Sequence, residues 1–313
     1  MNIQQKTINI LRVLSAEMVQ KANSGHPGAP MGMAAMAYAV WFKAMRHDPG
    51  APQWTNRDRF VLSNGHASAL LYSLLHLGGY DLPMEEIKRF RQWQSRTPGH
   101  PEHGMTAGVD TTTGPLGQGI ANAVGFAIAE TMLAAKFNRP GFPLVDHHTY
   151  VFAGDGCMME GIASEAASLA GTLKLNKLVV LYDDNEISIE GDTDLAFRED
   201  VGARFEAYGW RVLRVKDGLD ADEVFAAVEK ARSSDRPVLI VCLTIIGYGS
   251  EAKQGKASAH GEPLGADELA KTKQALGIAG EAFQVDSEVY AHVAGMMDQG
   301  RQARAQWEKL FEE

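Results

Sequence analysis

The chain has 313 residues, of which 45% are hydrophobic and 22% charged, a composition typical of a soluble protein able to bury a large core. Its formal net charge of −9 lacks the basic footprint of a nucleic-acid-binding protein. Its two cysteines, Cys157 and Cys242, form neither a disulfide framework nor a metal-binding pair, which favours a reducing, cytoplasmic setting. Polar residues near the N-terminus exclude a signal peptide.

The first third of the chain predicts helices separated by loops rich in glycine and proline. Helices are expected at 3–22, 31–45 and 67–78, with a short strand at 59–63 between the last two. A long loop from about 96 to 119 follows, too poor in charge to be disordered and long enough to be functional.

The next stretch, 117–136, is apolar but contains Gln118 and Glu130. We therefore expect a buried helix there and not a membrane span. Beyond it, short apolar runs alternate with helical patterns, which predicts a parallel sheet with helices on both faces, an α/β fold. The expected strands are 150–153, 178–182, 211–215 and 238–245, and the expected helices are 160–172, 220–233 and a terminal amphipathic helix at 287–311.

Two consecutive strands of the expected sheet end in polar residues that suit a metal and a diphosphate. Gly154-Asp155-Gly156 follows one strand, and Asn185 follows the next. If the two strands are neighbours, both side chains come out at the same edge of the sheet, which is where open α/β sheets bind ligands. Either motif alone is more often an ordinary turn. Their combination favours a binding site.

The chemistry of these residues fits a magnesium ion that holds a diphosphate. Asp155 offers a carboxylate, Asn185 an amide oxygen and Ile187 a backbone carbonyl, all hard oxygen ligands. Gly156 allows a backbone N–H to approach a phosphate closely. A helix expected to begin near Glu160 directs its positive end at the anion.

Over nearly its whole length the chain resembles the transketolases, a family of thiamin-diphosphate enzymes. Gly-Asp-Gly followed at this distance by asparagine is the signature of the thiamin-diphosphate enzymes. The resemblance rests on the motifs Ser24–Gly32, Ser63–His66, Thr97–Pro101, Thr111–Gly119, Gly154–Gly161, Phe205–Trp210 and Ser258–Gly261. It implies a diphosphate-binding domain over 1–262 and a helical extension or linker over 263–313, with thiamin diphosphate and Mg²⁺ or Ca²⁺ as cofactors.

The resemblance also implies roles for four of the ten histidines. His66 would donate to the cofactor diphosphate, and His260 would approach it. His26, His100 and His260 would bind the hydroxyls and carbonyl oxygen of a sugar and assist proton transfer, since an imidazole can act as donor and as acid or base near neutral pH. A lone loop histidine is more often simply exposed to solvent.

Four further positions receive roles from the same resemblance. Gly114, Pro115 and Leu116 would line the thiazolium and aminopyrimidine rings, although an ordinary turn is the alternative. Glu160 would form a carboxylate contact across a subunit interface near the cofactor. It is equally well explained as an acid that stabilises a helix N-terminus.

The implied reaction moves a two-carbon ketol unit from a ketose phosphate to an aldose phosphate. Transketolases carry a second, pyrimidine-binding domain that has no counterpart here, so the expected chain is a split subunit or a fragment. Its expected partners are that domain or subunit, sugar phosphates and a second copy in a homodimer, but neither nucleic acid nor membrane. We expect little or no activity from the chain alone.

Other functions remain as alternatives. A deoxyxylulose-phosphate synthase or a ketoacid dehydrogenase subunit would share the metal motif but not the combination of His26, His100 and His260. A nicotinamide-dependent dehydrogenase is disfavoured because no G-x-G-x-x-G follows a strand. A non-catalytic module that binds cofactor or partner is the third possibility.

Overall fold

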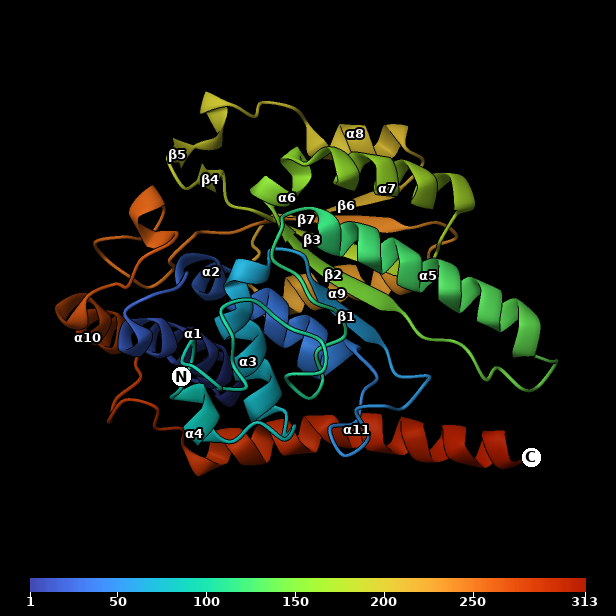
Figure 1. The fold of residues 1–313 in the computed structure, drawn as a ribbon, viewed down its shortest axis with the longest axis horizontal. Coiled ribbons are helices and arrows are strands. Elements are labelled where there is room, and N and C mark those ends of the chain that lie inside the picture. The colour runs from blue at the N-terminus through green and yellow to red at the C-terminus, as the bar shows by residue number, and fades with distance from the viewer.

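The computed structural model describes all residues from 1 to 313 and centres on a five-stranded parallel sheet (Figure 1). The strands are β1 (Arg59–Leu62), β2 (Thr149–Gly154), β3 (Leu178–Asp184), β7 (Val238–Leu243) and β6 (Arg211–Val215), in that spatial order. All four pairings are parallel. A two-stranded antiparallel hairpin, β4 (Ile187–Ser188) and β5 (Gly191–Asp192), extends beyond the end of β3.

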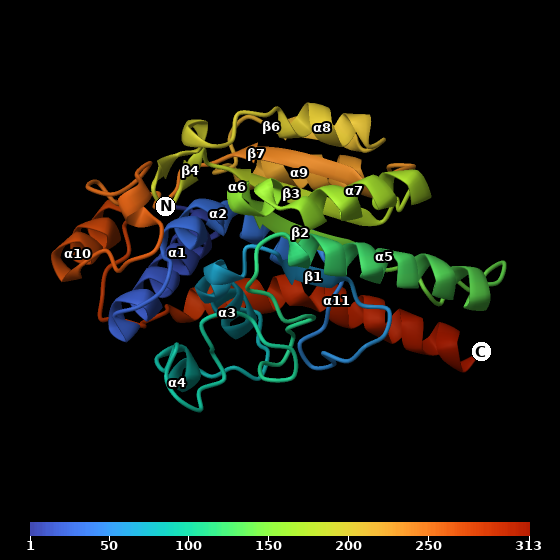
Figure 2. The same ribbon diagram turned by 45° about the horizontal axis from the view of Figure 1, so that its top comes forward.

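Helices cover both faces of the sheet, which confirms the expected α/β class (Figure 2). Alternate strand residues face opposite sides, so the sheet feeds two separate cores. The smaller core lies under α5 (Gln118–Phe137), α6 (Asp155–Met159), α7 (Gly161–Leu173) and α8 (Val201–Ala207). The larger one lies under α1 (Ile3–Ala22), α2 (Gly28–Tyr38), the π-helical turn Ala39–Ala44, α3 (Ser68–Leu77), α9 (Ala221–Arg232) and α11 (Ser287–Glu312).

Short elements α4 (Met84–Ile87) and α10 (Ala266–Ala275) lie at the periphery (Figure 1). The C-terminal helix α11 runs along the larger core, to which it contributes Val289, Val293 and Met297. Farther along, the indole N–H of Trp307 donates to the carbonyl of Leu144 at 2.8 Å. The last helix is therefore packed on the body of the molecule.

Most of the expected elements are confirmed, but helix α5 differs in its surroundings. We expected a buried helix, whereas only 28% of its most apolar stretch is buried. One side packs on the sheet through Ile120, Ala123 and Ala127, and the other side is open to solvent. By length and composition α5 is the one helix that could cross a membrane, which is weak support because core helices of globular proteins pass the same test.

The buried side chain of His47, which precedes β1, predicts that the folded protein loses stability in acid. His47 is 1% exposed, its Nε2 lies 2.8 Å from the carbonyl of Trp41, and its Nδ1 lies 2.7 Å from the Tyr80 hydroxyl. Burial lowers the pKa of His47 to about 4. Because the fold favours the neutral ring, the stability from His47 is complete above the unfolded pKa of about 6.5 and falls, by about 3 kcal/mol, as the pH drops towards 4.

Urea unfolding between pH 7.5 and pH 4.5 checks this expectation. In the variant His47→Gln the free energy of unfolding should depend less steeply on pH, by the slope that corresponds to uptake of about one proton. His103 lies exposed in a loop, so His103→Gln is the matched control. The slope of its unfolding free energy against pH should equal that of the unaltered chain. Equal slopes in all three proteins would contradict the assignment.

Candidate active site

The two strand ends that carry the polar motifs are neighbours in the sheet. Strand β2 pairs with β3 in parallel, and Gly154 lies opposite Asp183. The helix expected to begin near Glu160 is confirmed as α7, which begins at Gly161. The short helix α6, which begins at Asp155 directly after β2, was not predicted, and its N-terminus, not that of α7, follows the strand. At Glu160 the backbone is extended, with φ −78° and ψ 135°, and this residue separates α6 from α7.

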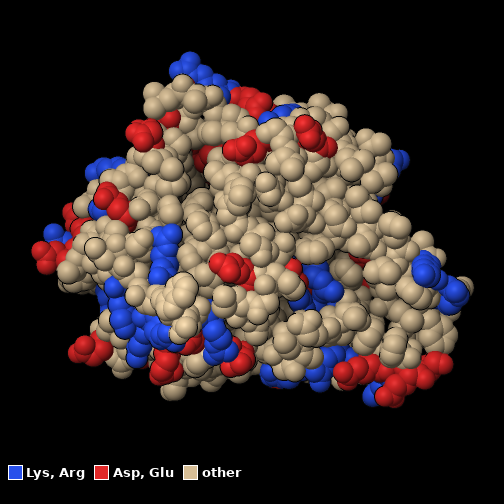
Figure 3. All heavy atoms as spheres, in the orientation of Figure 1, with Lys and Arg blue, Asp and Glu red and all other residues tan.

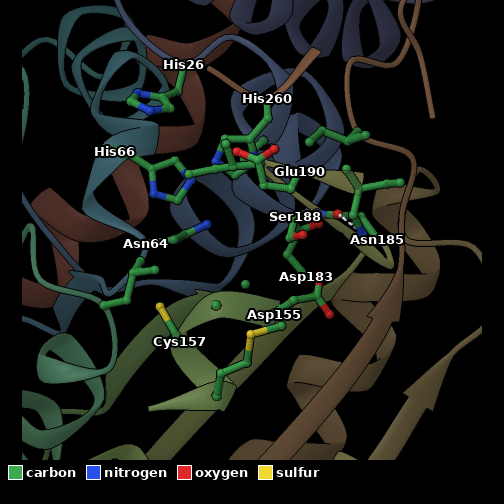
Figure 4. Close-up of a pocket in the computed structure, with 18 of the residues that line it drawn as sticks. His26, Asn64, His66, Asp155, Cys157, Asp183, Asn185, Ser188, Glu190 and His260 are labelled. Carbon is green, nitrogen blue, oxygen red and sulfur yellow. Dashed lines mark hydrogen bonds between the residues drawn. The ribbon is translucent and has the colours of Figure 1, made fainter. Parts of the chain in front are cut away.

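A cavity of about 410 Å³ opens at this edge and gathers most of the expected site residues (Figure 4). The expected residues that line it are His26, His66, His100, Gly114, Leu116, Asp155, Gly156, Asn185, Ile187 and His260. Pro115 and Glu160 do not line it, and both are exposed. The structure thus brings together residues from seven separate segments of the chain.

Asp155 is 4% exposed and keeps one oxygen without a partner. Its Oδ1 accepts a hydrogen bond from the Tyr182 hydroxyl at 2.5 Å, while its Oδ2 has none. Burial, with the neighbouring carboxylates of Asp183 and Asp184, raises the pKa of Asp155 to about 7. A buried carboxylate with a free oxygen is suited to a cation, which would offset the cost of its desolvation.

Asn185 is oriented by Asp183, a residue that we did not identify from the sequence. The Asn185 amide donates to Asp183 Oδ2 at 2.8 Å, and its Oδ1 accepts from the backbone N–H of Ile187 at 3.1 Å. Thr244 donates to the other Asp183 oxygen. The only sequence signal was the repeated aspartate before Asn185, and its function depends on the side-chain directions in the folded strand.

Glu186, next to Asn185, has a backbone conformation that favours glycine. Its φ is +59° although its side chain is exposed. The left-handed conformation costs a residue with a Cβ about 1–2 kcal/mol. Glycine avoids this cost, but part of the gain is offset because glycine makes the unfolded chain more flexible. We expect Glu186→Gly to raise the free energy of unfolding by up to about 1 kcal/mol.

Denaturant unfolding measures this difference. The control is Glu190→Gly in the same hairpin, where φ is not positive. That variant should lose stability, since glycine brings only added chain entropy there. A loss of similar size in both variants would rule out backbone strain at Glu186.

Three imidazoles form a compact group above Asp155 and Asn185 (Figure 4). The ring centroids of His26 and His66 lie 4.9 Å apart, those of His66 and His260 5.1 Å, and those of His26 and His260 5.6 Å. Burial is the main cause that lowers the pKa of His26 to about 4 and that of His66 well below its usual range. Burial also lowers the pKa values of His100 and His260. Neutral rings can each donate one hydrogen bond and accept another.

Unpartnered polar atoms around the cavity fit a polar ligand. Buried atoms with no hydrogen-bond partner include His26 Nδ1, His260 Nδ1, Asn64 Oδ1 and Asp155 Oδ2. Buried polar groups are normally satisfied, so such a cluster in one cavity calls for a partner from outside the chain. Donors and acceptors on one side and a carboxylate on the other suit a diphosphate, a metal and a heterocycle.

The loop before α5 forms one wall of the cavity. Gly114 packs beside His100, and a Cβ on Gly65 would meet Thr113 Oγ1 at 2.7 Å. A Cβ on Gly156 would meet Leu116 Cδ1, also at 2.7 Å. Small residues therefore let three segments approach closely here, as expected for a loop that supports a ligand.

Sequence reasoning assigned no role to several residues that line the cavity. They are Ala29, Asn64, Gly154, Cys157, Met159, Asp183, Ser188, Ile189, Glu190 and Ile246. Asn64 lies within a motif that we had noted, so its proximity to His66 was a usable signal. The β4–β5 hairpin residues had no such signal, because they reach the cavity only through the turn after β3.

Comparison with known proteins identifies the family and the fold. The family model "Transketolase, thiamine diphosphate binding domain" matches residues 3–313. The chain belongs to the transketolase family. Its resemblance to that family is therefore confirmed, and so are the thiamin-diphosphate-binding fold and the enzyme class of its relatives, the ketol transferases.

Individual transketolases align along almost the whole chain. Transketolase 1 of Escherichia coli (strain K12) is 57% identical over 312 residues, which are 99% of this chain but 47% of that protein. Transketolase of Halalkalibacterium halodurans is 54% identical, again over 99% of this chain and 47% of its own length. The chain spans about half the length of these relatives.

Solved transketolase structures share the fold closely. Transketolase from Leishmania mexicana superposes with a TM-score of 0.97 at 49% identity, covering 99% of this chain and 46% of that one. A Pichia stipitis transketolase in complex with sedoheptulose 7-phosphate gives 0.97 at 50% identity, with the same coverage of both chains. The match includes the whole five-stranded sheet described above.

Proposed function

We propose that this chain provides the diphosphate and metal half of a transketolase active site, which transfers a two-carbon ketol unit between sugar phosphates. The observation that carries the proposal is a single cavity that joins an oxygen-ligand group to a histidine group. The first comprises Asp155, Asn185 and Ile187, and the second His26, His66, His100 and His260. Metal and diphosphate chemistry explains the first group, and sugar chemistry explains the second.

In this proposal Asp155, Asn185 and the Ile187 carbonyl hold Mg²⁺ or Ca²⁺, all through oxygen atoms. The free Oδ2 of Asp155 is the observation that fits the metal. Tyr182 and Asp183 keep the two side chains in place. His66 and the backbone at Gly156 meet the diphosphate, and Gly114 and Leu116 border the rings of the cofactor. Pro115 between them is exposed and receives no contact in this proposal. Thiamin diphosphate, when bound, supplies a carbon nucleophile and an electron sink.

The histidines act on the sugar. Neutral His26, His100 and His260 each offer one N–H donor and one acceptor to hydroxyl and carbonyl oxygens. Their lowered pKa values leave an acceptor nitrogen free at neutral pH, which suits a base that removes a hydroxyl proton. The unpartnered Nδ1 atoms of His26 and His260 are the positions we assign to these contacts.

The rest of the site would come from a second domain or subunit. The chain spans about half the length of its relatives. The proposed partner is the pyrimidine-binding domain or subunit, which would close over the open side of the cavity. We propose that 1–262 form the cofactor domain and that 263–313 form a helical extension, whose last helix α11 packs back on that domain. We further propose a cytoplasmic protein of the pentose phosphate pathway with sugar phosphates as substrates.

We also propose that α5 and α7 pair with another protein chain, in a homodimer or with the partner subunit. Few charged side chains lie over these helices (Figure 3). Their exposed apolar residues are Met132, Leu133, Phe137, Ile162, Leu169 and Leu173. A contiguous exposed apolar surface of this kind marks an interface. Glu160 lies at the end of the same surface, where a contact across the interface would be made.

Sedimentation velocity is expected to show self-association of the chain at micromolar concentration. The double variant Leu133→Lys/Leu169→Lys, one change on each helix, should sediment as a monomer because it places two charges on the apolar surface. The control Phe311→Lys changes an exposed apolar residue on α11 and should associate like the unaltered chain. A monomer at every concentration in the unaltered chain would contradict the proposal.

The decisive experiment for the function supplies the missing half. The chain is mixed with a separately expressed second half of a bacterial transketolase, thiamin diphosphate and Mg²⁺, and ketol transfer from a ketose phosphate is measured. We expect activity in the mixture and little or none from either half alone. If the two halves form a complex but show no ketol transfer, the result would instead favour the non-catalytic module.

A further inference from the structure

Arg91 lies behind the histidine cavity and does not line it. It belongs to the irregular segment between α4 and α5, where its φ is +61°, a rare conformation for arginine. Its backbone N–H donates to the carbonyl of Thr97 at 2.9 Å. The side chain is half-buried. The side chain reaches inward from a turn whose next residues, Gln92, Trp93 and Gln94, are exposed.

The guanidinium joins two loops that each carry a site histidine. Its Nη1 donates to Ser24 Oγ at 2.8 Å, two residues before His26. On the other side it packs against Gly99, the residue before His100. A Cβ on Gly99 would lie 2.6 Å from Nε and 2.8 Å from Nη2 of Arg91, so the absence of a side chain at Gly99 makes room for the guanidinium.

Other contacts hold only one of these loops. Ser68 and Tyr72 on α3 donate to the carbonyls of Gly99 and Pro98, both at 2.8 Å. These bonds fix the His100 loop to α3 from below. These bonds do not connect the His100 loop to the His26 loop. Arg91 makes that connection, because its planar guanidinium has donors that can face both loops at once.

We propose that Arg91 is a positioning residue that holds the His26 and His100 loops in register for the ketol transfer. The proposal rests on the proposed function for the meaning of that register. It stands on its own as a statement about the two loops. Arg91 touches neither histidine ring through a hydrogen bond and acts through Ser24 and Gly99.

The charge of Arg91 supports this placement. Besides burial, the Arg91 cation lowers the pKa values of both His26 and His100. The other groups that face them are His260 and His100 for His26, and Glu102 for His100. The same side chain thus connects the loops and adds to the effect of burial, the main cause of the lowered pKa values of both imidazoles.

The first test needs no activity. In Arg91→Ala, amide hydrogen exchange should accelerate about 10- to 100-fold at Ser24, whose N–H donates to the carbonyl of Val19, and at Thr113, whose N–H donates to the carbonyl of Pro101. Exchange in β3 should stay unchanged. NMR titration should show higher pKa values for His26 and His100. The matched control is Arg89→Ala, whose guanidinium pairs with Glu86 at 3.0 Å on the exposed side. It should leave both loops unchanged.

Two further variants separate geometry from charge. Arg91→Lys keeps the cation but cannot serve both loops, so it should restore the histidine pKa values and not the slow exchange. Gly99→Ala leaves Arg91 in the sequence but occupies the space of its guanidinium, so it should loosen the Ser24–His26 loop. The positioning role would be overturned if Arg91→Ala kept the amide exchange rates of the unaltered chain, or if Arg91→Lys fully restored them.

The second test uses the chain mixed with the second half of a transketolase. Arg91→Ala should lower kcat about 10- to 100-fold with a smaller change in KM, since misplaced acid–base groups affect the chemical step. Unchanged kcat in an active mixture, despite faster loop exchange, would overturn the link to catalysis. An inactive wild-type mixture would instead refute the proposed function, and the exchange results would still decide whether Arg91 holds the loops.

Discussion

Asp155→Ala is expected to abolish metal-dependent binding of thiamin diphosphate. The change removes the one carboxylate that we assign to the metal, and Asn185 and the Ile187 carbonyl then offer only neutral oxygens. We expect the affinity for the cofactor in the presence of Mg²⁺ to fall by more than about 100-fold. Isothermal titration calorimetry with thiamin diphosphate, with and without Mg²⁺, measures the effect.

Two variants show whether binding or folding is lost. Asp155→Asn keeps an acceptor for the Tyr182 hydroxyl, which lies 2.5 Å from the carboxylate, and should fold normally while binding weakly. Asp298→Ala removes a carboxylate from the exposed side of α11 and should bind like the unaltered chain. Unchanged affinity in a folded Asp155→Ala protein would remove Asp155 from the metal site.

Gly300→Ala is expected to detach the C-terminal half of α11. A Cβ at this position would overlap the backbone carbonyl of His47, and a backbone atom cannot move aside as a flexible side chain can. Overpacking of a well-packed contact costs about 1–3 kcal/mol or more. The Trp307 hydrogen bond to Leu144 and the ion pair of Arg304 with Asp48 lie beyond Gly300 and should be lost with it.

The same helix contains the control. Gly295 is exposed, and a Cβ there meets nothing within 4 Å. Gly295→Ala should therefore raise the free energy of unfolding by about 0.5–1 kcal/mol, as alanine does in exposed helices. Urea unfolding and limited proteolysis near the C-terminus distinguish the two variants. Similar behaviour of both would mean that α11 does not depend on this contact.

The secondary structure, and the position of Asp155 and Asn185 at one edge of the sheet, could be predicted because their signals are local. The expected helix 3–22 corresponds to α1 and the expected strand 211–215 to β6, since apolar periodicity reports which face is buried. The short helix α6 was not predicted, because the extended backbone at Glu160 that separates it from α7 depends on packing between the two helices. The exposed side of α5 was also missed, since an apolar surface looks the same whether core or partner covers it.

The sequence by itself determined the fold class, the family and the residue types at the site, because these are written in ordered motifs along the chain. Only the tertiary structure decided which neighbours act on those residues. Asp183 orients Asn185, Tyr182 binds Asp155, and Arg91 joins the loops of His26 and His100. Such contacts depend on side-chain directions and on distances between segments far apart in sequence, which no local pattern records.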